Sequence, residues 1–294
     1  MPSSKPSQEE YLRRRAEALG FPPDLERAGK VFEFNMRAAY ESVLSGPIFA
    51  GIFEHLKQIR THYANGNPDL LFYPPSVLDD VKLYRKPFSS ALNKLYRVNV
   101  LYNRLYKPDR NDTKINAENI YESIEDLLRS RLICKYMDGP RFVSDELKQY
   151  CERNRIAYKL RALGTEGGYY AWHFYFRAPA EIMRENVAVV TCPIWVEIQL
   201  STQLAEVITS LTHGLYEQRR EGIVEGGEQD WRWEANSQRF RSAYIGHGLH
   251  LLEGIIQTFR DDVLQLGKRI ENEQSDDSGN MNDTDAEGGG SNDN

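Results

Sequence analysis

The sequence VAVVTCPIWVEIQL, residues 187–200, decides the fold class of this 294-residue chain. Its β-branched and aromatic residues favour an extended strand, and it carries the strongest strand signal in the sequence. Further strands are predicted at residues 131–136, 156–160 and 169–177. Because apolar residues at helical spacing precede and follow these strands, we expect an α+β domain in which helices flank a mixed or antiparallel β-sheet.

Helices are predicted wherever apolar residues recur at helical spacing. The first 70 residues are expected to be largely helical, with a break at Ser-Gly-Pro, residues 45–47. Other helices are predicted at about residues 87–96, 117–128, 203–219 and 237–271. We accordingly divide the chain into an N-terminal helical segment (1–75), a core (76–220), a C-terminal helical extension (221–270) and a tail (271–294).

The negative charge of the chain is concentrated near its C-terminal end. The formal net charge is −6, but residues 271–294 contain eight acidic residues and no basic one, so residues 1–270 carry a net charge of +2. The tail is rich in Asp, Asn, Gly and Ser and has too few apolar residues to offset the entropy lost on ordering. We therefore expect a disordered acidic tail on a mildly basic body, whose charge is compatible with a phosphate-rich partner.

Three features of the sequence bear on the compartment. The longest nearly apolar run, residues 187–196, is about half as long as a membrane-spanning helix, so we expect no membrane partner. The N-terminal residues are charged ahead of any apolar segment, unlike a secretion signal. Cys134, Cys151 and Cys192 are odd in number and widely spaced, which fits a reducing compartment, so a cytoplasmic localisation is expected.

Two predicted strands carry polar side chains in an otherwise apolar setting. In the strongest strand, alternation places Glu197 and Gln199 on one face, where a carboxylate can act as a metal ligand or general base. In the aromatic strand, it places Tyr169 and His173 on one face, which suits base stacking and phosphate contact, and an aromatic core layer that begins with Tyr170 on the other. The alternatives are a half-exposed strand and a hydrogen-bonded structural histidine.

Two further segments place charged groups near the start of a helix and of a strand. Lys86, Ser90 and Lys94 recur at four-residue spacing and line one face of a helix, where they can cradle a phosphate. Asp126 precedes the strand that begins near Arg131, and a carboxylate at such an edge can hold Mg²⁺ together with substrate phosphates. The alternatives are a solvated surface stripe and an ordinary Asp–Arg ion pair.

In their order along the chain, these motifs resemble the synthetase domain of the RelA/SpoT family. The resemblance spans about residues 81–216 and is most specific in the ungapped stretch 197–213. It implies a nucleotidyltransferase-like domain with helical N- and C-terminal extensions that uses Mg²⁺ to transfer pyrophosphate from ATP to the 3′-hydroxyl of a purine nucleotide. No histidine is followed by aspartate, so the hydrolase motif of the long members is absent and the resemblance is to a small alarmone synthetase.

The resemblance implies a role for each candidate residue. The ATP phosphates are expected to contact Lys86, Ser90, Lys94 and Arg131. The catalytic carboxylates that hold Mg²⁺ are expected to be Asp126 and Glu197, of which Glu197 also activates the acceptor hydroxyl. The acceptor side is expected to contain Tyr169, which stacks on the purine, and His173, with supporting roles for Gln199 and His213.

Several positions depart from the family pattern by losing positive charge. Tyr84 and Ser201 stand where arginine is usual. The segment that the resemblance places beside the acceptor, residues 165–170 and here called the acceptor loop, carries Glu166. Free GTP or GDP brings several phosphates that need neutralising, whereas the 3′ end of a tRNA presents a single phosphodiester. A guanosine nucleotide, giving (p)ppGpp-type alarmones, is the first candidate acceptor. A toxin that pyrophosphorylates the 3′-CCA end of tRNA is the alternative, and a non-catalytic nucleotide- or RNA-binding module is the third hypothesis. Small family members form homo-oligomers or pair with antitoxins, and both kinds of partner stay open.

Overall fold

The computed structural model describes residues 5–74, 77–79, 81–107, 114–184, 188–220 and 231–280. Its centre is a five-stranded sheet in the order β1-β2-β5-β4-β3. The strands are β1 (Tyr84–Arg85), β2 (Leu128–Cys134), β3 (Tyr158–Gly164), β4 (Tyr170–Met183) and β5 (Val189–Thr202). Strands β2 and β5 are parallel and the other neighbours are antiparallel, so the sheet is mixed. With the surrounding helices, this confirms the predicted α+β class.

Along the chain, the α-helices of the described residues lie before, between and after the strands. These are α1 (Gln8–Arg15), α2 (Leu25–Leu44), α3 (Pro47–Ile59), α4 (Phe88–Tyr96), α5 (Ile120–Ser123), α6 (Gly139–Arg153), α7 (Gln203–Arg220) and α8 (Gln238–Asn280). Shorter helical turns are η1 (Glu17–Leu19), η2 (Arg60–His62), η3 (Ala64–Gly66), η4 (Pro68–Leu70), η5 (Arg97–Leu101) and η6 (Trp231–Trp233). Helix α2 begins where the Asp24 carboxylate accepts hydrogen bonds from two backbone N–H groups of the first turn.

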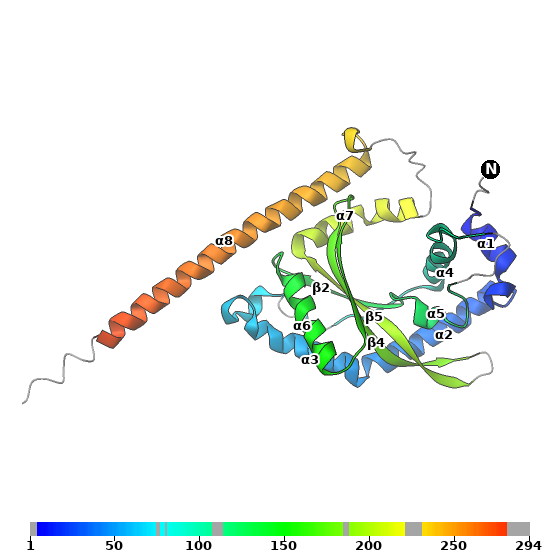
Figure 1. Cartoon of the computed structure of the whole chain (residues 1–294), viewed down its shortest axis with the longest axis horizontal. Coiled ribbons are helices and arrows are strands. Elements are labelled where there is room, and N and C mark those ends of the chain that lie inside the picture. The colour runs from blue at the N-terminus through cyan, green and yellow to red at the C-terminus, as the bar shows by residue number, and fades with distance from the viewer. Residues whose placement is uncertain are drawn as a thin grey trace, which may run out of the picture.

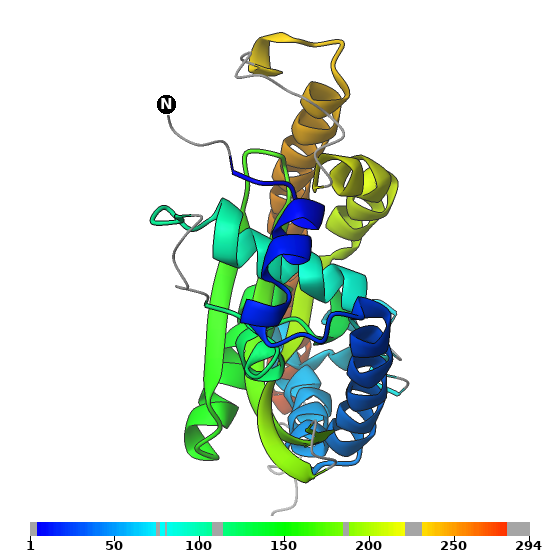
Figure 2. The same cartoon turned by 90° about the vertical axis from the view of Figure 1, so that its right-hand side faces the viewer.

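The apolar face of the sheet forms the core. Alternate residues of the two long strands are fully buried, among them Phe174, Phe176 and Ile198. Helices α2 and α6 contact β4, and α5 contacts β5. Asn35 fastens α2 to β4, because its side chain both donates to and accepts from the backbone of Met183. In Figure 2 the blue helices α2 and α3 lie along the same side of the green strands.

Two predicted elements in the middle of the chain have different bounds in the structure. The helix expected at 117–128 is limited to α5, and β2 starts at Leu128, ahead of the predicted residue 131. The reason is burial: Leu128 and Leu132 occupy alternate, fully buried positions of the sheet. Helix α6 was not predicted, although Val143 and Leu147 lie four residues apart on its buried side.

Other boundaries moved outward. Strand β4 runs beyond the predicted residue 177 to Met183, because its last residues pair with the beginning of β5. Helix α8 continues to Asn280 and so enters the segment 271–294 that composition predicted to be disordered. Residues 281–294 lie outside the described residues. Figure 1 shows the C-terminal half of α8 extending away from the rest of the chain. Across the described ranges, no helix has the length and apolarity needed to span a bilayer.

Candidate active site

Polar side chains form two rows across one face of the sheet. Because side chains alternate along each strand, residues in register on neighbouring strands share a face. The first row contains Arg129 on β2, Glu197 on β5, Tyr175 on β4 and Lys159 on β3. The second row contains Arg131, Gln199, His173 and Arg161 on the same strands. The predicted polar face of β5 is therefore continued on both sides by basic residues.

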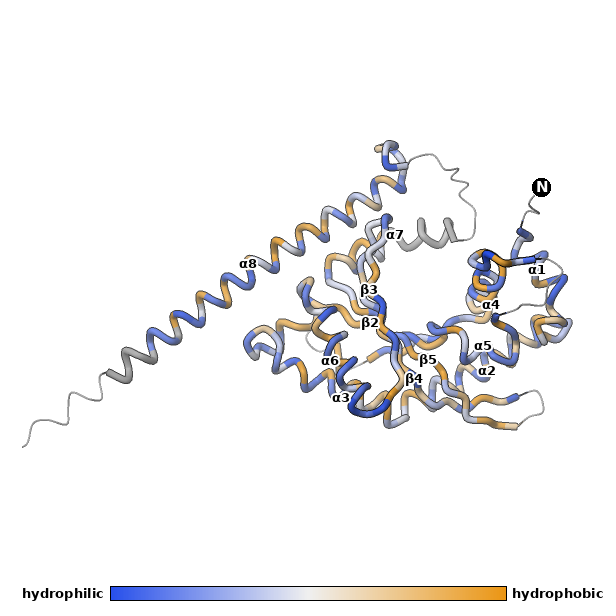
Figure 3. Tube along the Cα trace, in the orientation of Figure 1, coloured by the Kyte–Doolittle hydropathy of each residue, from blue (hydrophilic) through white to orange (hydrophobic). Residues whose placement is uncertain are grey.

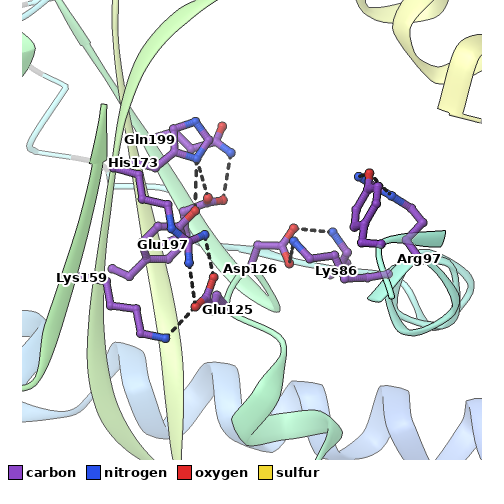
Figure 4. A network of polar contacts seen from close by, with 12 residues as sticks. Lys86, Arg97, Glu125, Asp126, Lys159, His173, Glu197 and Gln199 are labelled. Atoms are coloured by element: carbon purple, nitrogen blue, oxygen red, sulfur yellow. Dashed lines mark hydrogen bonds and ion pairs between the residues drawn. The ribbon is translucent and has the colours of Figure 1, made fainter. Parts of the chain in front are cut away.

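Glu197 is held by donors on two strands. It is buried, with 3% of its surface exposed. His173 Nδ1 lies 2.8 Å from its Oε1, and Gln199 Nε2 donates a 2.9 Å hydrogen bond to its Oε2 (Figure 4). Burial and the neighbouring Glu197 charge raise the pKa of the Tyr175 hydroxyl, so this group stays protonated beside the carboxylate. The direction of the carboxylate is thus set by its neighbours, as a general base requires.

His173 connects Glu197 to the acceptor loop. Since a carboxylate only accepts hydrogen bonds, the 2.8 Å contact assigns an imidazole proton to Nδ1. In the neutral ring Nε2 is then an acceptor, and the Tyr169 hydroxyl lies 3.1 Å from it. The structure therefore brings the predicted acceptor-side residues and the predicted base together in one hydrogen-bonded chain, Tyr169–His173–Glu197.

Asp126 lies between two lysines at the entrance to β2. Lys86 Nζ is 2.7 Å from its Oδ2, and Lys94 Nζ is 3.5 Å from its Oδ1. In the view of Figure 4, Asp126 lies between Lys86 and Glu197. Burial alone would raise the pKa of Asp126, but the charges of Lys86 and Lys94 outweigh it and hold that pKa below its usual value. Asp126 is therefore an anion embedded between cations.

The helix predicted to present Lys86, Ser90 and Lys94 is α4, with Pro87 as its N-cap. Lys86, just before the helix, is buried with 6% of its side chain exposed, and Lys94, in the last turn, is 31% exposed. Ser90 is half-buried on the same helix. The solvated stripe that the sequence left open is therefore wrong, because the lysines of this face turn towards Asp126.

Arg131 pairs with a residue that the sequence reasoning did not consider. Its guanidinium contacts the Glu206 carboxylate at the start of α7, at an N–O distance of 2.5 Å. The Asp126–Arg131 ion pair that the sequence left open is therefore replaced, since Asp126 takes the two lysines and Arg131 takes Glu206. Arg131 remains 39% exposed and lies beside Gln199 on the polar face.

Sequence reasoning missed a second charged cluster beside Glu197. Glu125 accepts from Lys159 at 2.6 Å and pairs with Arg161 at 2.8 Å. Burial alone would raise the pKa of Glu125, but its hydrogen bonds from Lys159 and Arg161 outweigh it and lower that pKa. The Arg161 guanidinium also lies over the Tyr175 ring, 5.1 Å from its centroid. The available signal was the two-residue spacing of the basic residues on β3, which places them on one face.

Helix α8 packs against the acceptor loop. Gly168 has a φ of 77°, and a side chain there would collide with the backbone of Ala243. Tyr170 was expected in the core layer, but its ring stacks on His250 at a centroid distance of 3.6 Å and its hydroxyl lies 2.8 Å from His247 Nδ1. Tyr170 therefore lies on the predicted face of β4, opposite His173, but packs against α8 and not in the main core.

The charge of the acceptor loop is altered by the segment before α8. Arg232 in η6 forms a 2.9 Å ion pair with Glu166, the acidic residue of the loop. His247 Nε2 lies 3.2 Å from the backbone carbonyl oxygen of Glu166. The negative charge that the sequence placed beside Tyr169 is therefore compensated by a residue distant in the chain. His213 lies in α7 at a position where the side chain is outside the described structure.

The two carboxylates expected to hold Mg²⁺ fit that role. Asp126 Oδ1 is buried and, among the described residues, has no closer polar contact than the 3.5 Å ion pair with Lys94 Nζ. Glu197 accepts hydrogen bonds from His173, Gln199 and the Tyr175 hydroxyl, which leaves one acceptor position of the carboxylate for a cation. Asp126 lies two residues before β2, whose Arg129 is in register with Glu197. In the described ranges no three His, Cys, Asp or Glu side chains form a metal site, and Mg²⁺ commonly takes only one or two carboxylates with substrate phosphates.

Comparison with known proteins identifies the fold. No protein-family model and no curated protein sequence matches the chain. The structure of small alarmone synthetase 1 from Bacillus subtilis is similar, with a TM-score of 0.51 and 18% sequence identity over 80% of this chain and 98% of that chain. A GTP pyrophosphokinase family protein from Streptococcus pneumoniae gives a TM-score of 0.47 and 17% identity over 80% of this chain and 95% of that chain. The first likeness shows that the chain shares its fold with a small alarmone synthetase.

Proposed function

We propose that the chain is a Mg²⁺-dependent pyrophosphokinase that transfers the pyrophosphate of ATP to the 3′-hydroxyl of a purine nucleotide, with a guanosine nucleotide as the first candidate acceptor. The observation that carries the proposal is the buried Glu197 carboxylate, which His173 and Gln199 orient. Asp126, which contacts two lysines, lies just before the neighbouring parallel strand, whose Arg129 is in register with Glu197. The fold shared with a small alarmone synthetase supports this assignment.

The cationic residues around Asp126 supply the ATP side. Lys94 and Arg131 are both partly exposed, so their charges are accessible to the triphosphate, whereas Lys86 is buried against Asp126. Ser90 adds a hydroxyl on the same helix. Asp126 Oδ1 and Glu197 would hold Mg²⁺, which, when bound, neutralises charge on the transferring phosphates. The residues therefore position ATP and require no covalent nucleophile.

Glu197 is assigned as the base. The acceptor oxygen attacks the β-phosphorus of ATP as the bond from that phosphorus to the α-bridging oxygen breaks, and AMP leaves. The hydroxyl proton passes to a Glu197 oxygen, whose position is maintained by Gln199 and His173. Tyr169, linked to His173, supplies the ring on which the acceptor purine stacks. Each protein group thus orients or accepts a proton, and the chemistry stays with the two nucleotides.

A tRNA 3′ end is the second candidate acceptor, favoured by an exposed surface next to the acceptor loop. Trp233 in η6 is 85% exposed. Beside it, the guanidinium groups of Arg232 and Arg239 lie over the Trp231 ring at 5.4 and 4.5 Å from its centroid. Arg232 connects this surface to the loop through Glu166. An exposed aromatic ring such as that of Trp233 is suited to stacking on unpaired bases, and basic residues near it in the chain suit contacts with the phosphates.

A labelling experiment tests the proposal. The full chain is incubated with Mg²⁺ and ATP labelled at the γ-phosphate, in separate reactions with GDP, GTP, AMP and deacylated tRNA. We expect label on GDP or GTP with the wild-type chain, and none with Glu197→Gln. Label on tRNA alone selects the second candidate. Nucleotide binding with no label on any acceptor contradicts the enzymatic assignment and leaves a binding module.

A further inference from the structure

Helix α8 carries an uninterrupted apolar stripe in its exposed half. Large apolar residues follow one another at alternating spacings of four and three residues: Leu252, Ile256, Phe259, Val263, Leu266 and Ile270. All six are exposed, from 41% for Ile256 to 70% for Phe259. Figure 3 shows apolar positions recurring along this helix. Exposed apolar residues scattered singly need no explanation, but a continuous stripe of this length does.

The stripe lies on a different face from the one by which α8 is attached. The attached face includes Gly246 against Gly168, His250 against Tyr170, and Arg260. Arg260 forms two hydrogen bonds to the Asp138 carboxylate, at 3.0 and 2.9 Å, and only 9% of its side chain is exposed. These contacts fix the helix to the body. No residue of the described chain buries the apolar stripe, which therefore faces outward in the single copy.

The spacing identifies the kind of partner. Alternation of four and three gives an average period of 3.5 residues, which keeps an apolar seam facing a second helix that winds around the first. We infer that a second copy of this chain covers the stripe, and that the two α8 helices form a parallel two-stranded coiled coil.

The residue types favour this arrangement. The six residues of the stripe would form the seam of the coiled coil. One set of seam positions holds the β-branched residues Ile256, Val263 and Ile270, and the other holds Leu252, Phe259 and Leu266. β-Branched residues at the first position of the repeat and leucine at the fourth favour two parallel strands. In that arrangement each seam residue lies opposite its own copy, so one sequence supplies both halves of every layer.

The area available is close to what a dimer needs. From their exposed fractions, the six side chains would bury on the order of 500–600 Å² in each copy, against about 800 Å² for a standard protein–protein interface. Ile255 flanks the seam with an exposure of 60%. The stripe is therefore large enough for a reversible dimer, which we expect to dissociate on dilution.

The mass of the full chain in solution tests the inference. Sedimentation equilibrium from about 1 to 100 μM should show a transition from 34.0 kDa towards twice that mass. Phe259→Glu should raise the dimer dissociation constant about 100-fold or more, since it places a charge in the seam. Leu251→Glu is the matched control, because Leu251 is as exposed as Phe259 but lies outside the seam. Circular dichroism and thermal unfolding at low concentration should be unchanged in both variants.

Cross-linking tests the orientation. The native cysteines are buried, so Leu266→Cys introduces an exposed thiol in the seam. Mild oxidation should give a disulfide-linked dimer, because the two thiols are opposite one another only in the parallel, in-register pair. A monomeric mass at 100 μM, or dissociation of Leu251→Glu to the same degree as Phe259→Glu, overturns the inference. Absence of the cross-link in a dimer of the correct mass overturns the parallel arrangement. None of these readouts depends on catalysis, so they are independent of the proposed function.

Discussion

Replacing Asp126 by asparagine removes the anion that holds a buried ammonium group. Lys86 Nζ lies 2.7 Å from Asp126 Oδ2, with 6% of the lysine side chain and 16% of the aspartate side chain exposed. Lys94, 31% exposed, is the second cation. The asparagine side chain keeps nearly the same shape but carries no charge, so the ammonium of Lys86 is left desolvated without a counter-ion.

The expected cost follows from that burial. Breaking a buried ion pair by removing one partner costs about 3–5 kcal/mol, whereas the partly exposed Lys94 contributes at most about 1 kcal/mol. We expect Asp126→Asn to lower the free energy of unfolding by about 3 kcal/mol at pH 7, and the melting temperature by roughly 6–12 °C. The double variant Asp126→Asn/Lys86→Met removes both charges and should return to within about 1 kcal/mol of the wild type.

The pH dependence separates charge from packing. In the wild type the lowered pKa of Asp126 means that its ionisation stabilises the fold above its unfolded pKa, and that this contribution is lost as the pH falls through the lower folded value. In Asp126→Asn, Lys86 loses the partner that opposes the lowering of its pKa by burial. The unfolded state then binds a proton that the folded state releases, so the stability of the variant rises with pH between the lowered folded pKa of Lys86 and the unfolded lysine pKa, at about pH 10.

Urea unfolding at pH 7 and pH 9 measures these differences. The double variant serves as the reference that lacks both charges, and its gap to Asp126→Asn should narrow at pH 9. A stability of Asp126→Asn within about 1 kcal/mol of the wild type at pH 7, or a double variant no more stable than the single one, would contradict a buried, uncompensated Lys86 charge. Either result would mean that Lys86 is solvated in the folded protein.

Two further predictions concern the base and the acceptor loop. Glu197→Gln should reduce the initial transfer rate by about 100- to 10,000-fold. Its melting temperature should change little, because His173 can change tautomer and accept a hydrogen bond from the new amide. A transfer rate near that of the wild type would show that Glu197 is not the base. Gly168→Ala should cost about 1–3 kcal/mol and raise the KM for the acceptor, because Gly168 has a φ of 77° and its backbone touches α8. Gly167→Ala is the matched control, since its new Cβ would meet only the Thr165 hydroxyl at 3.6 Å, and equal effects in the two variants would contradict the assignment.

The four long strands were all predicted, with bounds displaced by a few residues. The stretch at 187–200 corresponds to β5 (Val189–Thr202), with residue 187 outside the described ranges. Its β-branched residues and alternation are local properties, and local sterics determine both. The predictions that failed depend on contacts between distant segments. The end of β4 is set by its pairing with β5, and Leu128, the last residue of the helix expected at 117–128, begins strand β2 because it is buried in the sheet.

The candidate site was predicted in its residue types but not in its contacts. Alternation placed Glu197 with Gln199 and Tyr169 with His173, and the strand register then brought the two pairs together. The pairing of Asp126 with Lys86 was not predicted, because the two lie 40 residues apart in the chain. For the same reason the Glu125 cluster went unnoticed, since its partners come from a different strand.

The sequence by itself determined which residues alternate on a strand, which recur on a helix face, and where the negative charge is concentrated. These properties depend on bond geometry and on side-chain chemistry within a few residues. Only the tertiary structure decided that Lys86 is buried against Asp126, that Arg232 neutralises Glu166, and that the seam of α8 faces outward. Desolvation and ion pairing depend on the whole packed chain, because the dielectric surroundings of a charge are created by segments distant in sequence.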